Sequence, residues 1–130
     1  MSNPNLASVS NINGYTTYYI PSGTSAVSLL NNASGSGQNL KIESLTVANT
    51  SASAVNASVA YYSNATVQGS APSGGTAYYI CSTVSVPPNA TLVVIEKSNT
   101  VYLNENACIA ITSGTANDLT FVVSYENMSQ

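Results

Sequence analysis

Short runs in which apolar and polar residues alternate recur along the whole chain, and no segment shows the spacing of an amphipathic helix. In the run at residues 107–112, Ala107, Ile109 and Ile111 occupy every second position and so share one face of an extended strand. The residues between them carry no charge, so both faces of this strand can be covered. Clusters of glycine, proline, asparagine and serine separate the runs, which is typical of a sandwich or barrel. The pattern predicts nine strands, at residues 15–20, 26–30, 40–48, 55–62, 77–86, 91–95, 100–103, 107–112 and 119–125.

The run at residues 40–48 changes its alternation in the middle. Leu40 and Ile42 share one face, whereas Leu45 and Val47 share a face of the opposite parity. One extra residue near positions 43–44, a β-bulge, would turn all four side chains into the same core.

The turns between the runs and the length of the chain predict one sandwich domain with an N-terminal arm. Residues 69–75 are predicted to form a mobile loop, and a chain of 130 residues is a single domain by length. Residues 1–14, rich in asparagine and serine, are predicted to be a flexible arm. Residues 15–130 are then an antiparallel β-sandwich of about eight or nine strands, either a jelly roll or an immunoglobulin-like sandwich.

The chain is poor in charge, with no histidine, no arginine and seven charged residues in 130. Area scaling for 13.3 kDa gives a folded monomer about 6,400 Å² of surface, or roughly 900 Å² for each charge. One partner contributes about 800 Å² to a standard protein–protein interface. We therefore expect a subunit covered by its own copies or by other proteins; the alternative is a monomer solvated by uncharged polar groups. The charged residues are Lys41, Glu43, Glu96, Lys97, Glu105, Asp118 and Glu126.

Few residues are left for catalysis or for binding ions. General acid–base chemistry usually needs histidine, or carboxylates and lysines gathered in a cleft. Glu96 and Glu105 flank one predicted hairpin and could approach each other, but a solvated pair beside a turn is the simpler interpretation. Residues 104–106 or 117–118 could supply calcium ligands, although neither segment has the spacing of a loop that wraps an ion. We predict no catalytic residue, no metal site and no cofactor, and two lysines are too few to bind nucleic acid.

Whether the two cysteines form a disulfide depends on the compartment in which the chain folds. Nothing at the N-terminus resembles a secretory signal, and no apolar run is long enough to span a membrane. We therefore expect folding in a cytoplasm, where thiols stay reduced. Cys81 and Cys108 are predicted to be free, buried, small apolar residues; a disulfide is the alternative if their strands are neighbours.

The aromatic residues form a more specific pattern. Nine tyrosines accompany one phenylalanine and no tryptophan, and three tyrosine pairs recur. Because neighbours on a strand point to opposite faces, each pair should place one ring in the core and one outside. Outward tyrosines suit a protein–protein interface and could also stack on a sugar; a third interpretation is that tyrosine merely fills the sheets. The candidate interface residues are Tyr18, Tyr19, Tyr61, Tyr62, Tyr78 and Tyr79.

The C-terminal part of the chain reads VSVPPNATLVVIEK at residues 84–97, VYLNE at 101–105, ANDL at 116–119 and SYE at 124–126. These segments resemble small virion structural proteins of tailed bacteriophages, above all those of marine and cyanobacterial phages. In that pattern alanine stands where this chain has Pro88, and glutamate stands where it has Asn104. The N-terminal half resembles these proteins only in outline. The resemblance implies a place in a virion and no particular activity.

We therefore expect a non-enzymatic structural protein of a phage virion, assembled in the host cytoplasm. The first expectation is a capsid decoration (cement) protein, a homotrimer that binds the major capsid protein and stabilises the shell through its apolar and tyrosine-rich surface. A neck, tail or fibre subunit that contacts another virion protein is the alternative, and a glycan-binding module is a third. Neither nucleic acid nor a membrane is expected as a partner.

Overall fold

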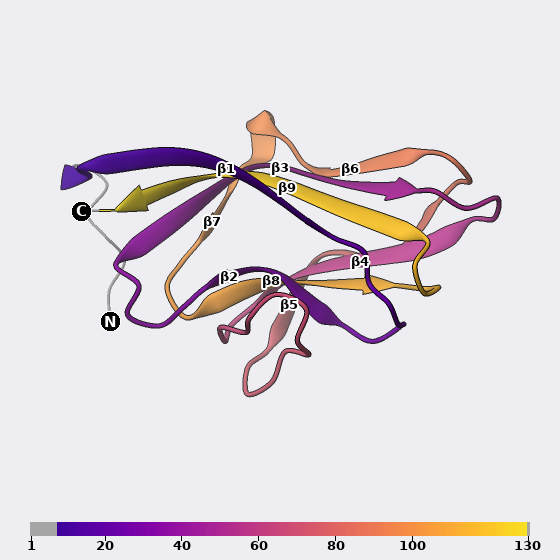
Figure 1. The fold of residues 1–130 in the computed structure, drawn as a ribbon, viewed down its shortest axis with the longest axis horizontal. Coiled ribbons are helices and arrows are strands. Elements are labelled where there is room, and N and C mark those ends of the chain that lie inside the picture. Colours follow the sequence, from indigo (N-terminus) through magenta and orange to yellow (C-terminus); the bar gives the residue numbers. More distant parts are fainter. Residues whose placement is uncertain (1–7, 130) are drawn as a thin grey trace.

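Residues 8–129 are described by the structure, a computed structural model, and they form two antiparallel β-sheets packed face to face (Figure 1). This architecture confirms the predicted all-β sandwich. Each of the nine predicted strands is present, and β4, β5 and β6 have the predicted bounds. The elements are β1 (Asn11–Tyr19), β2 (Val27–Asn32), β3 (Gln38–Asn49), β4 (Val55–Tyr62), β5 (Ala77–Val86), β6 (Thr91–Ile95), the 3-10 helix η2 (Lys97–Asn99), β7 (Val101–Leu103), β8 (Ala107–Ser113) and β9 (Leu119–Ser129).

The strand order is that of a jelly roll. The five-stranded sheet is ordered β1-β9-β3-β6, with β7 also pairing with β3, and the four-stranded sheet is ordered β2-β8-β4-β5. The antiparallel pairs are nested, because β4 pairs with β5, β3 with β6 and β7, β2 with β8, and β1 with β9. The chain is thus one long hairpin wrapped around the core. An immunoglobulin-like sandwich instead pairs its first strand with the next one in sequence, so that alternative is wrong.

The bulge predicted in β3 is confirmed. The pairing of β3 with β9 shifts register between Ile42 and Ser44, which inserts one residue into β3. As a result Leu40 and Ile42 before the shift, and Leu45 and Val47 after it, all lie buried in the same core. A regular strand would have turned one of these two pairs toward solvent.

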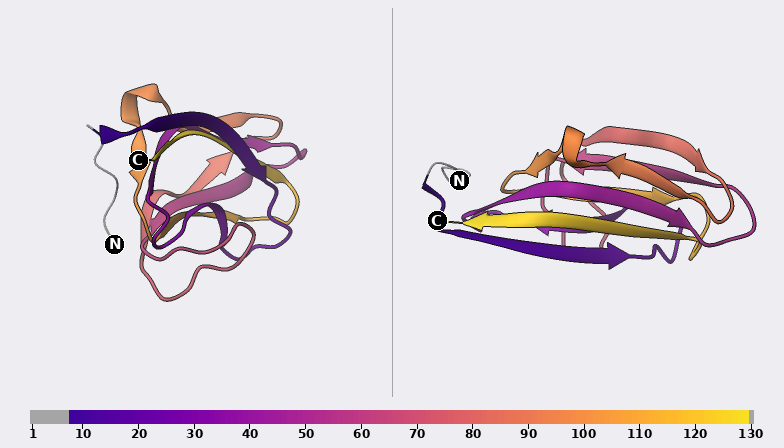
Figure 2. Two further views of the ribbon diagram at one scale, coloured as in Figure 1. Left: turned by 60° about the vertical axis from the view of Figure 1, so that its left-hand side comes forward. Right: turned by 90° about the horizontal axis from the view of Figure 1, so that it is seen from above.

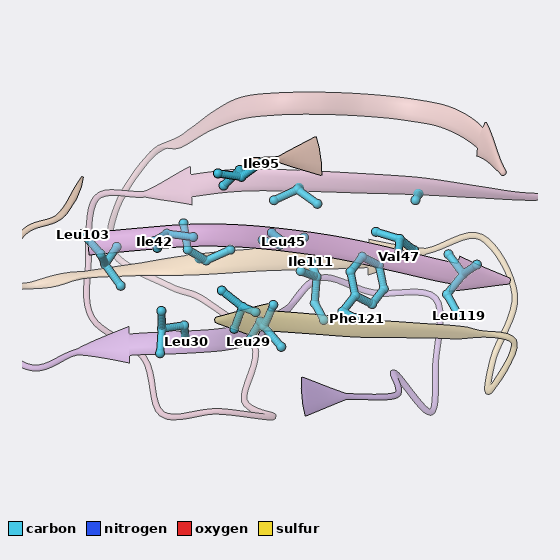
Figure 3. Packing of buried hydrophobic residues seen from close by; sticks show 14 of the residues in the cluster. Leu29, Leu30, Ile42, Leu45, Val47, Ile95, Leu103, Ile111, Leu119 and Phe121 are labelled. Atoms are coloured by element: carbon cyan, nitrogen blue, oxygen red, sulfur yellow. The ribbon is translucent and has the colours of Figure 1, made fainter. Parts of the chain in front are cut away.

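The core lies between the sheets and is filled from both inner faces (Figure 3). Phe121 of β9, the only phenylalanine, is fully buried, as are Ile109 and Ile111 of β8. Leu29 of β2 and Ile95 of β6 are buried in the same cluster. Burial of one such side chain contributes about 1.5–3 kcal/mol, so this cluster is the main source of stability.

Two buried asparagines join the sheets where β2 and β3 end. The side-chain nitrogen of Asn32 in the four-stranded sheet donates to the carbonyl oxygen of Leu103 in the other sheet, at 2.9 Å. In the opposite direction, the side-chain nitrogen of Asn49 in β3 donates to the carbonyl oxygen of Val86 in β5, also at 2.9 Å. These bonds satisfy polar groups that burial would otherwise leave unpaired. The sequence does not mark these two positions, because asparagine is frequent throughout the chain.

The predicted boundary between arm and domain lies too late in the chain. β1 begins at Asn11, so residues 11–14 belong to the sandwich and not to an arm. β9 runs to Ser129, beyond its predicted end at residue 125, and the additional residues pair with the first part of β1: Asn11 lies opposite Ser129 and Gly14 opposite Glu126. The prediction from sequence missed this part of β1 because its residues are exposed and do not alternate between apolar and polar. Residues 1–7 of the predicted arm lie outside the described residues.

Deletion of Ser44 tests the dependence of the fold on the bulge. The deletion shortens β3 by one residue, which abolishes the bulge and forces either Leu40 with Ile42, or Leu45 with Val47, out of the core. Because each buried side chain contributes about 1.5–3 kcal/mol, the free energy of unfolding should fall by at least about 3 kcal/mol in urea titrations followed by circular dichroism. The matched control, Ser44→Ala, keeps the residue count and should stay within about 0.5 kcal/mol of the wild type. A deletion variant as stable as this control would contradict the assignment.

Candidate binding groove and exposed tyrosines

The four-stranded sheet carries a groove on its outer face, the side turned away from the core. The groove has a volume of about 280 Å³, and its lining combines small side chains with two tyrosines and no charged group. Ala110 of β8, Ala60 of β4 and Tyr79 of β5 lie side by side in register across three neighbouring strands and line it. Tyr62 and Pro72 line it as well. The result is an uncharged site with aromatic rings from two strands.

The connection between β4 and β5, residues 63–76, lies against the outer side of this sheet (Figure 1). It reaches the opposite edge strand, where the backbone N–H of Gly69 donates to Ser28 and the N–H of Ser28 donates to the carbonyl oxygen of Ser70, both at 2.9 Å. The N–H of Thr66 donates to the side-chain oxygen of Asn31, also at 2.9 Å. The loop predicted to be mobile is therefore tied to β2 at its start.

The base of the same loop holds Tyr62. The backbone N–H of Gly75 donates to the Tyr62 hydroxyl at 3.1 Å. A Cβ at Gly75 would come within 2.9 Å of the Asn64 Cβ and of the Ser63 hydroxyl, so only glycine fits here. Gly75 thus lets the loop approach closely enough to position Tyr62 beside the groove.

Two of the three tyrosine pairs divide between core and surface as predicted. Tyr19 and Tyr61 pack against the hydrophobic core. The other tyrosine of each pair lies on the outside of the sandwich: Tyr18 is 69% exposed, and Tyr62 is half-buried and lines the groove. The alternation of side chains along β1 and β4 accounts for both pairs.

The third pair departs from this prediction, because Tyr78 and Tyr79 are both exposed, at 60% and 62%. β5 is the outermost strand of its sheet, and its pairing with β4 shifts register on both sides of Val59. Thr83 within β5 also has a positive φ of 52°, which a regular strand does not contain. Tyr78 and Tyr79 themselves pair in regular register with Tyr61 and Ala60, so they still point to opposite faces. Both rings are exposed because β5 is an edge strand with no neighbour on its outer side. Whether the six tyrosines form an interface stays a prediction.

Both cysteines carry free thiols. They lie on β8 and β5, the two strands that flank β4, with Cys108 opposite Tyr62 and Cys81 opposite Val59. Cys108 is fully buried, as predicted, whereas Cys81 is only half-buried. Burial raises the pKa of both thiols above the ordinary value for cysteine. Neither thiol has the lowered pKa that marks a reactive cysteine.

Four of the seven charged side chains have a partner nearby, and none of the seven lines the groove. Lys41 pairs with Glu43 at 3.3 Å, and the hydrogen bond and charge of Glu43 raise the pKa of the Lys41 ammonium. Glu105 accepts a hydrogen bond from the N–H of Gly37 at 2.9 Å, and Glu96 accepts one from the Ser98 hydroxyl at 2.8 Å. Each of the two carboxylates considered as a catalytic pair is therefore used in a separate turn.

The two segments considered as calcium ligands, residues 104–106 and 117–118, are parts of turns. The side-chain oxygen of Asn106 accepts a hydrogen bond from the N–H of Ala65, and both Asn106 and Asn117 adopt the positive φ typical of tight turns. Within residues 8–129, no three histidine, cysteine, aspartate or glutamate side chains come together in a way that could hold a metal ion.

Comparisons with known proteins add no relative: neither protein-family models nor curated proteins match the chain. The class defined by the structure is thus an antiparallel β-sandwich with jelly-roll strand order. No helix in the described part of the chain is long and apolar enough to cross a membrane.

The raised pKa values predict a loss of stability at alkaline pH. Burial raises the pKa of Tyr125, with a smaller contribution from the nearby Tyr15, whose ring centroid lies 5.7 Å away. The folded state therefore favours the neutral forms of Tyr125, Cys81 and Cys108. Their contribution is fully present below the ordinary pKa values of 9.0 for cysteine and 10.0 for tyrosine, and it is lost as the pH rises through the higher folded-state values.

Urea unfolding from neutral pH to above pH 10 measures this loss. The free energy of unfolding should fall across that range, and it should fall less steeply in Tyr125→Phe, which cannot ionise, than in the wild type. An equally steep decline in Tyr125→Phe and in a Cys81→Ala variant would show that other groups cause it.

Proposed function

We propose that this chain is a non-enzymatic structural protein of a tailed-phage particle, and specifically a capsid decoration protein that binds the major capsid protein and stabilises the shell. The observation that carries the proposal is the amount of exposed, uncharged aromatic surface: Tyr18, Tyr78 and Tyr79 are each at least 60% exposed. Tyrosine is enriched at protein–protein interfaces, because a large ring can be buried at low entropic cost. Such surface favours a protein that is covered in its working state.

A row of uncharged side chains on the outer face of the five-stranded sheet supports the same conclusion. Tyr18 of β1, Val122 of β9, Thr46 of β3 and Val93 of β6 are direct neighbours in register, so the row crosses the whole sheet. Val93 is 52% exposed. A strip of this kind matches the apolar centre of an interface better than a surface meant for water.

The resemblance of residues 84–126 to phage virion proteins supports the location, and the jelly roll supports it by analogy. Jelly rolls recur in viral capsid proteins and in lectins. Because one fold hosts many functions, this analogy is weaker support than the exposed tyrosines. The homotrimer expected from the sequence stays a prediction.

Two other positions in the particle would use the same surface. A neck, tail or fibre subunit would bury it against a different virion protein and would be found only at the tail vertex. A decoration protein would be found over the whole shell. A density map of the particle separates these positions directly.

A glycan-binding module is the second candidate function, and the groove is the observation that favours it. Tyr62 and Tyr79 line a site of about 280 Å³ without charged groups, and aromatic faces of this kind can stack on a sugar ring. A phage protein with both properties could brace the shell and also hold the particle near a glycan-coated host.

The double variant Tyr78→Ser/Tyr79→Ser tests the decoration function. Because truncation of an interface hot spot costs about 1–2 kcal/mol or more, the amount of the chain retained on purified particles should fall roughly five-fold or further. The measurement is the ratio of this chain to the major capsid protein after gradient purification. Tyr102→Ser is the matched control, because Tyr102 is also exposed but lies opposite Lys41 in the charged part of the five-stranded sheet. Unchanged retention of the double variant, with a shell map that lacks the chain, would refute a decoration function.

A glycan array tests the second candidate. If the groove binds sugars, Tyr79→Ala should lose the signal, because it removes one of the two rings that line the site. Tyr18→Ala, which alters an exposed tyrosine on the other sheet, should keep it. Absence of binding by the wild-type chain, or equal binding by Tyr79→Ala, counts against this function.

A further inference from the structure

The edges of the two sheets differ in how they are protected. An outermost strand presents unpaired N–H and C=O groups that can pair with another chain, and natural proteins guard such strands with charge, proline, bulges or a covering loop. The described residues form four such edges: β2 and β5 on the four-stranded sheet, and β1 and the β6–β7 side on the five-stranded sheet.

Three of these edges carry a guard. The loop at residues 67–70 covers β2, where the N–H and C=O of Ser28 are already bonded to Ser70 and Gly69. β5 is bulged twice, as its register against β4 records. The third edge is divided between two short strands, and η2 with Glu96 and Lys97 interrupts it.

Within residues 8–129, the fourth edge, β1, carries none of these devices. Its nine residues, NINGYTTYY, include no charge and no proline, and its register against β9 runs without a shift from Asn11 to Tyr19. Seven of the nine residues are exposed. Figure 2 shows β1, in indigo, as the outermost strand beyond β9.

The ladder geometry identifies which backbone groups of β1 are free. In an antiparallel pair, alternate residues face the partner strand. The N–H of Thr50 donates to the carbonyl oxygen of Asp118, one step beyond the last pair of the β3–β9 register. The backbone N–H and C=O groups of the even-numbered residues in β9 therefore face β3. Those of the odd-numbered residues face β1. In β1 the odd-numbered residues therefore face β9, and the even-numbered residues Ile12, Gly14, Thr16 and Tyr18 turn their N–H and C=O groups to the open side.

The hydrogen bonds of Gln68 agree with this assignment and mark where the open part of β1 ends. The side-chain nitrogen of Gln68 donates to the carbonyl oxygen of Tyr18 at 3.3 Å and to that of Leu29 in β2 at 2.9 Å. Gln68 thus closes the gap between the two sheets at this end of β1. Among the described residues, the backbone groups of β1 that stay open are those of Ile12, Gly14 and Thr16, which are symmetric about Gly14.

We propose that β1 pairs with β1 of a second copy of this chain, antiparallel and around a two-fold axis at Gly14. In this register Gly14 of one copy lies opposite Gly14 of the other, and Ile12 lies opposite Thr16. Each of these pairs exchanges two backbone hydrogen bonds. The two five-stranded sheets then form one continuous sheet.

The open edge matches a second copy better than a different protein. A contact between copies that joins two different edges needs two open edges. Of the four described edges only β1 is open, so both copies must use β1. Such a contact is isologous and has two-fold symmetry. β1 carries no charge that would repel its own copy. Among the described residues nothing lies within 4 Å of the position of a Cβ at Gly14, so a side chain placed at the axis has room.

This contact rests on the proposed function and deepens it by naming how copies touch, and it can be tested on the isolated chain. It replaces the homotrimer expected from the sequence with a two-fold dimer. A chain that does not pair with itself can still attach to a shell, and a chain that does not attach to a shell can still pair with itself. The two proposals therefore fail in different experiments. A capsid strand that pairs with β1 in place of a second copy is an outcome that would overturn the proposal.

Gly14→Pro is the decisive variant. Proline removes the N–H that faces the open edge and leaves the bonds to β9 in place. The wild-type chain should have a mass in solution of twice 13.3 kDa by light scattering, and Gly14→Pro should have the mass of one chain. Gly14→Ala, which keeps the N–H, should remain a dimer. A wild-type monomer or trimer, or a dimer that Gly14→Pro does not dissociate, would overturn the proposal.

A crosslink decides the register and does not depend on the folding of the proline variant. Directly opposed, hydrogen-bonded residues have Cα atoms about 5.5 Å apart, within the range of a disulfide. Gly14→Cys should therefore form a covalent dimer under mild oxidation. Tyr18→Cys, on the same face but away from the axis, should not, and neither should the wild type with its two native thiols. Crosslinking of Tyr18→Cys in place of Gly14→Cys would refute the axis at Gly14.

Discussion

The extra residue in β3 is the constraint on which the rest of the structure depends. β3 is the longest strand and pairs with β9 on one side and with β6 and β7 on the other. Its bulge between Ile42 and Ser44 keeps Leu40 and Leu45 on the same side of the sheet although their positions differ in parity. Because β9 follows β3 in register, and β1 follows β9, the position of the whole five-stranded sheet over the core is decided at this point.

The shortage of charge has a structural counterpart in the outer faces of the sandwich. The buried side chains of Asn32 and Asn49 donate to backbone carbonyls and need no ion pair. The outer faces are left with tyrosine, alanine and threonine, which desolvate at little cost. The same composition therefore permits a groove on one sheet, an apolar row on the other and an edge strand without a guard. All three features suit a protein that is covered by partners.

Predictions from the sequence succeeded where the physical cause is local and failed where a neighbouring strand decides. The bulge at residues 43–44 was predictable because four large apolar residues cannot share a face without it. The exposure of both Tyr78 and Tyr79 was not, because it depends on the place of β5 at the edge of its sheet. The start of β1 was missed for a related reason: residues 11–14 are ordered by the far end of β9 and have no apolar pattern of their own.

The sequence by itself determined the nine strands, the faces of most of them, the all-β class and the absence of histidine chemistry, because alternation, turn residues and composition are properties of neighbouring positions. Only the tertiary structure decided the jelly-roll order, the groove and the open edge. Each of these depends on which distant strands pair: the order on β1 with β9, the groove on β4 between β8 and β5, and the edge on what the loop at residues 63–76 covers. Many pairings are compatible with the same alternation, and the packing of the complete core selects one.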